Sequence, residues 1–190
     1  MIGTFSTEDL NKILRQNCFE VFGLPLQYSI DQSLLNNKYQ ELQKQLHPDK
    51  FINHPDSLLS IRVSAHINDS YNTLNSPLLK SIALLQQNGI TLDLNVDKEL
   101  PADFLMEQME LYEEIEDASH DTGKLNDLAQ KLIDKVRALS DKISLGFASK
   151  GMDSRLRGND SYGIIIEDTK KMAFYNKIAH LIDQKIEESW

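Results

Sequence analysis

Residues 32–50 read QSLLNNKYQELQKQLHPDK, and this stretch decides the fold of the first half of the chain. Its larger apolar side chains recur at intervals of three and four residues, which predicts an amphipathic helix over about residues 32–46. They are Leu35, Tyr39, Leu42 and Leu46. Asp31 is a suitable N-cap residue, and Pro48 ends the helix because proline disfavours a helical backbone in the residue before it. The tetrapeptide His47-Pro48-Asp49-Lys50 is therefore expected at an exposed turn.

A second helix is predicted after this turn, over about residues 57–74, with Leu59, Val63, Ile67 and Leu74 along one stripe. The residues Asn75-Ser76-Pro77 interrupt it, and Pro77 suits the first turn of a short helix that runs through Leu85. A short helix at residues 18–22 precedes the pair. The first half thus reads as a small helical unit built on an antiparallel helix pair.

The second half predicts a separate three-helix bundle. Residues 88–100 carry no helical stripe and mark the boundary, and helices are expected at about 101–118, 124–145 and 167–189. The apolar positions of the second helix are Leu125, Leu128, Leu132, Val136, Leu139 and Ile143, and those of the third are Phe174, Ile178 and Leu181, flanked by Tyr175 and Ile182. Residues 146–163 contain four of the eight glycines and are expected to form an exposed insertion loop. The predicted fold class is all-α.

The expected organisation along the chain has four parts. They are an N-terminal extension at 1–16, a helical domain at 17–88, a linker at 89–100 and the bundle at 101–190.

Composition excludes several classes of protein. The 190 residues carry a net charge of −9, and residues 96–190 hold 20 acidic against 13 basic residues, which argues against a nucleic-acid partner. No apolar run approaches the roughly 18 residues that a membrane-spanning helix needs. The single cysteine, Cys18, excludes an internal disulfide and paired-cysteine zinc sites. Without a secretory or transit signal in the sequence, a cytoplasmic location is expected.

No pattern in the sequence predicts a cofactor or a metal. His54, His66, His120 and His180 do not have the spacing of metal ligands. Gly146 and Gly151 have half the spacing of a phosphate-binding loop, but Met152-Asp153 stands where Lys-Ser/Thr is required. His47 and Asp49 could form an acid–base pair, yet an exposed turn provides no pocket that tunes their pKa values.

Two segments resemble the J-domain of DnaJ-type co-chaperones. They are Tyr39-x-x-Leu42-x-x-x-Leu46-His47-Pro48-Asp49-Lys50 and Ile67-Asn68-x-x-Tyr71-x-x-Leu74-x-x-Pro77. Three further segments are similar to the HscB family, the specialised J-proteins of iron–sulfur cluster assembly. They are Phe22-Gly23-Leu24-Pro25, Lys50-Phe51 and the acidic stretch FLMEQMEL at 104–111, and Phe174 followed by Lys177-Ile178 matches the family's last helix. The resemblance covers about residues 17–145 and 166–189.

This resemblance implies a non-enzymatic co-chaperone with an L-shaped pair of domains and no cofactor. The J-domain would engage an HscA-type chaperone and stimulate its ATP hydrolysis, and the bundle would bind an IscU-type scaffold protein. His47, Pro48 and Asp49, followed by Lys50, match the residues that transmit the ATPase signal. Family J-domains also use basic residues on the preceding helix, where this chain offers only Lys38 and Lys44, so electrostatic steering is expected to be weak and salt-sensitive.

The helix at 101–118 supports the scaffold-binding expectation from its own residues. Projected at 100° per residue, its apolar arc spans about 240°, whereas one bundle helix needs an arc on the order of 100–140°. The surplus is expected to form an exposed apolar strip with an acidic border, which suits a partner surface. Packing of the strip under the first domain is the alternative. The positions that match the family's scaffold contacts are Leu105, Met106, Met109, Glu110 and Glu113, and Phe174 is added from the last helix.

Two other functions remain open from sequence. A general J-protein that delivers unfolded clients is one, although the chain has neither a Gly/Phe-rich linker nor paired CxxC modules. A small hydrolase that uses His47 and Asp49 is the other, and it requires turnover by the protein alone.

Overall fold

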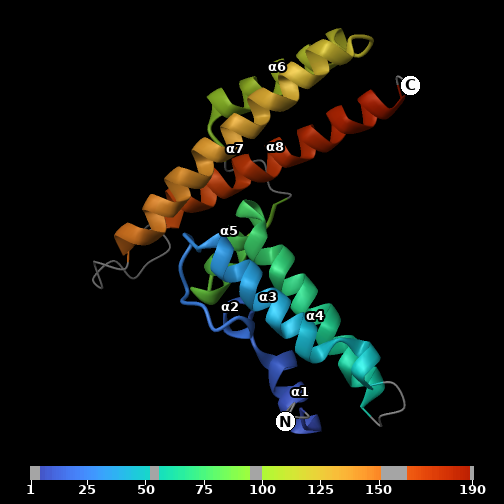
Figure 1. The fold of residues 1–190 in the computed structure, drawn as a ribbon. Helices are drawn as coiled ribbons and strands as arrows, with labels where there is room; N and C mark the ends of the chain where they lie inside the picture. The colour runs from blue at the N-terminus through green and yellow to red at the C-terminus, as the bar shows by residue number, and fades with distance from the viewer. Residues whose placement is uncertain (1–4, 52–55, 95–99, 151–161, 189–190) are drawn as a thin grey trace. The chain divides into compact units, whose positions relative to one another are not determined.

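The computed structural model describes residues 5–51, 56–94, 100–150 and 162–188, and these residues form helices and connecting turns without a β-strand (Figure 1). The predicted all-α class is confirmed. The chain divides into two compact units, Met1–Gln87 and Asn88–Trp190. His54, residues 95–99 of the expected linker and residues 151–161 of the expected insertion lie outside the described residues.

Unit 1 is organised around one long central helix. In chain order its elements are α1 (Thr7–Arg15), α2 (Cys18–Val21), α3 (Gln32–Leu46), the 3-10 helix η1 (Pro48–Phe51), α4 (Ser57–Asn75) and α5 (Pro77–Gln87). α4 contacts all of the others, and α3 lies alongside it (Figure 1). Val63, Ile67 and Leu74 of α4 are fully buried at the centre of this unit.

The helix boundaries in unit 1 follow the local sequence signals. The carboxylate of Asp31 accepts hydrogen bonds from the backbone N–H groups of Ser33 and Leu34, at 2.8 and 3.1 Å, so the expected N-cap of α3 is confirmed. Gly89 follows α5 with a φ of +78°, a conformation that glycine adopts without steric cost.

The helix α1 lies in the predicted N-terminal extension, for which no helix was expected. It begins with a capping box, in which the Ser6 hydroxyl and the Asp9 carboxylate each bond the other residue's backbone N–H. Leu10 is fully buried in unit 1, and α1 packs against α4. The Ser-x-x-Asp spacing was a readable start signal, but nine residues with few apolar positions do not predict a stable helix without the surface of α4.

The described part of unit 2 contains three helices, α6 (Ala102–Asp117), α7 (Thr122–Lys150) and α8 (Gly163–Glu188). α7 and α8 make the most extensive contact between any two elements (Figure 1). The backbone of α6 stays further from them, and α6 packs through the buried side chains of Phe104, Leu111 and Ile115.

Both ends of the expected insertion loop are helical, which corrects the boundaries at 145 and 167. α7 continues to Lys150 and α8 begins at Gly163. Gly146 makes this extension possible, because a Cβ atom at its position would lie 2.8 Å from Cγ1 of Ile165 on α8. The rings of Phe147 and Tyr162 also pack together, with centroids 6.3 Å apart.

The buried face of α8 is rotated from the predicted one. The predicted core face consists of Phe174, Ile178 and Leu181, but Phe174 and Leu181 are only half-buried. The buried side chains in this part of α8 are those of Met172, Tyr175, Ile178 and Ile182. Val136, expected in the seam of α7, is also half-buried, whereas the other five predicted positions are buried.

Within the described ranges, no helix is both long enough and apolar enough to span a bilayer.

Candidate functional site: the HPD turn and the exposed strip of α6

The HPD turn, residues 47–51, joins α3 to the segment that leads into α4. His47 is the C-cap of α3, and its backbone carbonyl accepts a hydrogen bond from the Lys50 N–H at 3.0 Å, which closes the turn. The Asp49 N–H donates to Nδ1 of His47 at 3.3 Å. Phe51 is buried, and η1 contacts α4, so the turn is anchored at its end.

The side chains of His47 and Asp49 face solvent. The exposed fractions of the His47 and Asp49 side chains are 54% and 78%, and Nδ1 of His47 lies 3.4 Å from Oδ2 of Asp49. Water reaches both groups, so this pair does not have the enclosed surroundings of an acid–base catalyst. The arrangement is suited to presenting an imidazole and a carboxylate to another protein.

The helix pair below the turn is cross-linked by polar groups. The rings of Tyr39 on α3 and Tyr71 on α4 stack with centroids 4.1 Å apart. The Tyr39 hydroxyl and the Gln43 side-chain amide both donate to Oδ1 of Asn68, and the Tyr71 hydroxyl donates to Oδ1 of Asn36 at 2.9 Å. Contacts from both helices therefore fix the pair that carries the turn.

The three lysines predicted for the chaperone-binding surface differ in exposure. Lys44 and Lys50 are exposed, whereas Lys38 is half-buried. The ammonium of Lys38 lies close to Gly23, 3.8 Å from the position that a Cβ atom would take there.

The second candidate surface is the exposed apolar strip of α6, which we define as Leu105, Met106, Met109 and Tyr112. The exposed fractions of Met106 and Met109 are 64% and 66%, and those of Leu105 and Tyr112 are 37% and 40%. Glu110 and Glu113 are exposed on the same helix. Phe104, Leu111 and Ile115 occupy the opposite, buried face. Four large apolar side chains on one exposed face form a contiguous patch of the kind that marks protein interaction sites.

Phe174 connects the strip to the core of unit 2. Its ring packs edge-on against Tyr112 of the strip, with centroids 6.1 Å apart, and against the buried Phe104 at 5.6 Å. The half-buried ring thus supports the strip from α8 and keeps part of its own surface accessible.

The carboxylate of Glu107 fixes the orientation of α6. Its Oε1 accepts hydrogen bonds from Nζ of Lys135 on α7 at 2.6 Å and from the Tyr175 hydroxyl on α8 at 2.7 Å. Burial alone would raise the pKa of Glu107, but the hydrogen bonds from Lys135 and Tyr175 outweigh this effect and the pKa lies below its usual value. Burial and the neighbouring Glu107 carboxylate raise the pKa of Tyr175.

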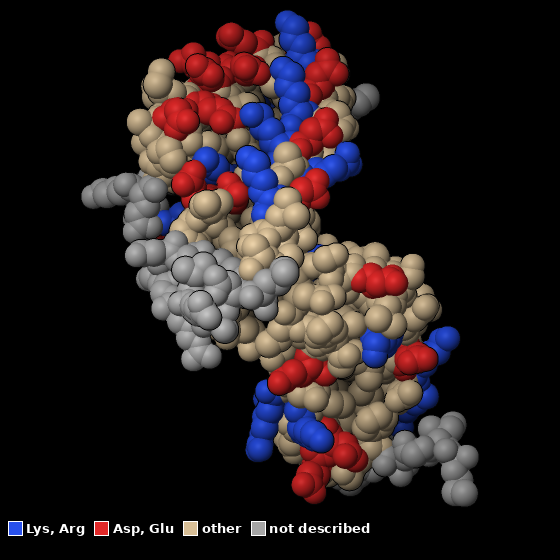
Figure 2. All heavy atoms as spheres, turned by 90° about the vertical axis from the view of Figure 1, so that its left-hand side faces the viewer, with Lys and Arg blue, Asp and Glu red and all other residues tan. Residues whose placement is uncertain are grey.

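Two further ion pairs join α6 to its neighbours. Glu114 pairs with Lys131 of α7 at 3.8 Å, and Glu116 pairs with Lys185 of α8 at 2.9 Å. On the face of unit 2 shown in Figure 2, acidic side chains flank a row of basic ones. Acidic residues of α6 therefore serve two purposes, since some join the helices and others border the strip.

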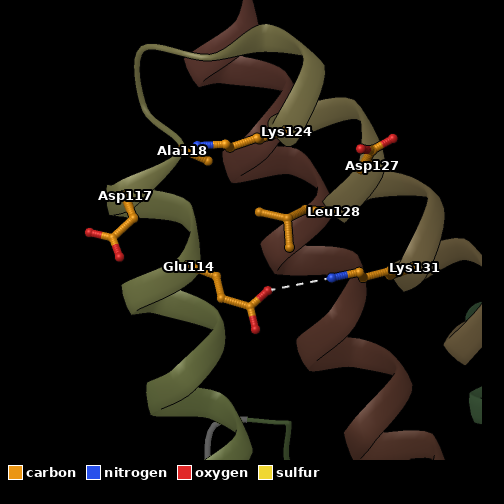
Figure 3. A pocket seen from close by; sticks show the side chains of 7 residues that line it. All are labelled: Glu114, Asp117, Ala118, Lys124, Asp127, Leu128 and Lys131. Atoms are coloured by element: carbon orange, nitrogen blue, oxygen red, sulfur yellow. Dashed lines mark ion pairs between the residues drawn. The ribbon is translucent and has the colours of Figure 1, made fainter.

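A pocket of about 300 Å³ lies near the turn between α6 and α7 (Figure 3). Ala118 and Leu128 form its apolar floor, and the Glu114–Lys131 ion pair crosses one side. The remaining lining residues, Asp117, Lys124 and Asp127, are exposed and of mixed charge. The pocket is shallow and separate from the strip, and its lining selects no single class of ligand.

A second cavity, of about 350 Å³, lies between the N-terminal part of α6 and the other two helices. Its lining includes Asp168, which is buried and whose pKa is raised by burial, partly offset by Lys142 and Lys171. Over the described ranges, no three His, Cys, Asp or Glu residues are grouped so that they could hold a metal ion.

Comparison with known proteins identifies the family. The family model of the HSCB C-terminal oligomerisation domain matches residues 100–183. A co-chaperone protein HscB homologue from Aromatoleum aromaticum is 30% identical over 178 residues, which cover 92% of this chain and 96% of the relative. The chain belongs to the HscB family.

Other HscB proteins support the assignment. A homologue from Vibrio vulnificus strain YJ016 is 44% identical over 117 residues, which cover 60% of this chain and 67% of the relative. The solved structure of chaperone HscB from Vibrio cholerae has a TM-score of 0.73 and 29% identity, covering 92% of this chain and all of that one. The crystal structure of human co-chaperone HscB has a TM-score of 0.78 and 25% identity, covering 90% and 82%. The family predicted from the HPD turn and α6 is confirmed.

Within this HscB chain, the structure brings the predicted scaffold-contact positions of α6 onto one exposed face. Leu105, Met106 and Met109 are all exposed there. Tyr112 was not among the predicted positions, although it falls at 80° in the same helical projection, beside Leu105 at 100°. Phe174 is close to this face through Tyr112.

Proposed function

We propose that this HscB-family co-chaperone acts in iron–sulfur cluster assembly by connecting two proteins. Its HPD turn would stimulate ATP hydrolysis by an HscA-type chaperone, and the strip of α6 would bind an IscU-type scaffold protein. One observation carries the proposal: this chain of the HscB family has both an exposed HPD turn and an exposed apolar strip. Contacts with neighbouring helices hold the helix that carries each surface.

The proposed action of the HPD turn is allosteric. To change the rate of ATP hydrolysis, the turn must contact the hydrolysis-competent state of the chaperone more favourably than its other state. The exposed imidazole of His47 and carboxylate of Asp49 provide charge-assisted hydrogen bonds for this contact. Because the cross-linked helix pair already orders the turn, little conformational entropy is lost on binding.

The proposed scaffold site is the strip of α6 with its acidic border. Met106 and Met109 present flexible apolar side chains that adapt to a partner surface. Glu110 and Glu113 favour a partner whose contact region has basic residues at its edge. With both surfaces on one chain, bound scaffold has a raised effective concentration at the chaperone.

The HPD turn is tested by His47→Gln in an ATPase assay with the cognate chaperone, with and without scaffold. We expect the stimulation to be lost and the affinity for the scaffold to stay within about twofold of wild type. An equal loss of ATPase stimulation and of scaffold affinity would contradict the division of function between the two units.

The same assay separates the two alternative functions. Stimulation by unfolded clients but not by the folded scaffold would favour a general J-protein. Turnover by the purified protein alone would favour a hydrolase.

The strip is tested by the double variant Leu105→Ala with Met106→Ala. Scaffold affinity should fall by at least about 2 kcal/mol, the magnitude of an interface hot spot. Ile133→Ala is the matched control, because Ile133 is an exposed apolar residue of α7 outside the strip. Unchanged affinity in the double variant, with the helix content of wild type, would exclude the strip as the binding site.

A further inference from the structure

The two methionines of the strip differ sharply in accessibility from the methionine of the core. Met106 and Met109 are 64% and 66% exposed, whereas Met172 of α8 is fully buried. Met1 and Met152 lie outside the described residues. The exposed pair is separated by one helical turn, so both sulfur atoms belong to the same patch.

A thioether that is exposed to solvent is open to peroxide. The sulfur lone pair attacks one peroxide oxygen, a sulfur–oxygen bond forms as the oxygen–oxygen bond breaks, and water leaves after proton transfer. The sulfur is oxidised by two electrons and the peroxide is reduced by two. The product, methionine sulfoxide, is polar, and methionine sulfoxide reductases return it to methionine.

We propose that Met106 and Met109 are a reversible oxidation site that switches the strip from an apolar binding surface to a polar one. The inference rests on the proposed binding of a scaffold at this strip. Sulfoxide oxygens at both positions would have to lose their water on binding, and an apolar partner surface offers them no hydrogen-bond donor. Affinity would therefore fall with oxidation and return on reduction.

Peroxide is expected to act on the strip without disturbing the rest of the molecule. Both side chains point away from the core, and the buried face of α6 is made by Phe104, Leu111 and Ile115, so oxidation should not unfold the helix. Cys18, the single thiol of the chain, belongs to unit 1, and burial raises the pKa of its thiol, which disfavours the reactive thiolate.

The first measurement uses the free protein and no partner. Full-length protein is treated with hydrogen peroxide, and the sulfoxide at each methionine is followed by peptide mass spectrometry. Met106 and Met109 should be oxidised at least about tenfold faster than Met172, because oxidation follows exposure of the sulfur. Equal rates at the three positions would overturn the inference, whatever the function of the strip.

The second measurement compares scaffold affinity before oxidation, after oxidation and after treatment with sulfoxide reductases. We expect a loss of at least about tenfold, equivalent to about 1.4 kcal/mol, that the reductases reverse. The double variant Met106→Leu with Met109→Leu, compared with its own untreated sample, should lose no scaffold affinity in peroxide, since leucine has no sulfur to oxidise. Met172→Leu is the control that should remain sensitive.

The outcomes separate this inference from the proposed function. If the unoxidised protein does not bind the scaffold, the proposed function is wrong. If it binds, and protein with sulfoxide at both positions binds within twofold as tightly, the switch alone is wrong. A loss of affinity on oxidation that persists in the double leucine variant would assign the effect to another residue and would also overturn the inference.

Discussion

Tyr39 and Tyr71 stack across the α3–α4 pair with an angle of 23° between their ring planes, and each hydroxyl donates to an asparagine of the opposite helix. Tyr71→Phe keeps the ring and removes the hydrogen bond to Asn36. We expect it to lower the free energy of unfolding of unit 1 by about 0.5–1.5 kcal/mol, the net contribution of one hydrogen bond. Tyr71→Leu should lower the free energy of unfolding by a further amount on the order of 0.5–1.5 kcal/mol, because the stacking of the two rings is also lost.

Urea unfolding followed by circular dichroism measures both values. Tyr112→Phe, at an exposed position of α6 in unit 2, is the control for removing a tyrosine hydroxyl elsewhere in the chain. A Tyr71→Phe variant as stable as wild type would show that water replaces the bond to Asn36 at no cost.

Two carboxylates of unit 2 should give opposite dependences of stability on pH. The pKa of Glu107 lies below its usual value of 4.5 in the folded state, so its stabilising contribution is present above that pH and is lost as the pH falls. Burial raises the pKa of Asp168 above its usual 3.8, so its contribution is unfavourable at neutral pH and diminishes on acidification.

Glu107→Gln should therefore destabilise unit 2 at pH 7 by about 1 kcal/mol, a value reduced by the partial exposure of the ion pair, and should have little effect near pH 3. Asp168→Asn should leave stability at pH 7 unchanged or raise it. Thermal unfolding from pH 3 to pH 8 measures both variants. Loss of stability in Asp168→Asn at pH 7 would show that the charged carboxylate is stabilising.

The contribution of α1 to unit 1 is tested at Leu10. Leu10→Ala should lower the free energy of unfolding by about 2–5 kcal/mol, because the side chain is fully buried. Glu8→Gln, on the exposed face of the same helix, should stay within about 0.5 kcal/mol of wild type. Equal stability of the two variants would mean that α1 is not part of the cooperative unit.

The first turn of α4 is tested at Thr7, whose hydroxyl donates to Oδ2 of Asp56 at 2.8 Å. Asp56 is the N-cap of α4 but makes no capping hydrogen bond with its side chain. Thr7→Val should increase amide hydrogen exchange at the start of α4, and Thr7→Ser should restore protection. Exchange unchanged in Thr7→Val would show that this bond does not order the helix start.

Gly146→Ala should destabilise unit 2 although alanine is the better helix former. Its Cβ atom would lie 2.8 Å from Cγ1 of Ile165, and overpacking of this kind costs about 1–3 kcal/mol. Gly163→Ala is the control, since no atom lies within 4 Å of the added methyl group, and it should be neutral or gain up to about 1 kcal/mol. In a Gly146→Ala background, Ile165→Val should recover part of the loss. A stabilised Gly146→Ala variant would show that α7 and α8 move apart freely.

Helical periodicity predicted most of this fold because it depends on residues that are close in sequence. The helix at 32–46, its cap at Asp31 and the exposed face of α6 all follow from local spacing. The family also followed from local segments, since the residues around the HPD turn and those of α6 are contiguous.

The predictions of buried residues and helix boundaries were wrong where contacts between residues distant in sequence determine the structure. On α8, Tyr175 rather than Phe174 is buried, and its hydroxyl bonds to Glu107, 68 positions earlier in the chain. α7 extends past residue 145 because Gly146 meets Ile165. α1 forms because α4 covers Leu10. No local pattern in the sequence specifies these pairings.

The shared oxygen of Glu107 also constrains how α6 can move. Because groups from two different helices bind the same atom, a rotation of α6 about its axis or a slide by one turn breaks both bonds at once. Alternative settings of the helix, which would turn Met106 and Met109 inward, are therefore disfavoured before any partner arrives. A protein that docks on α6 therefore finds the strip already facing outward. Its affinity for this chain is not reduced by a population of molecules in which α6 is turned inward.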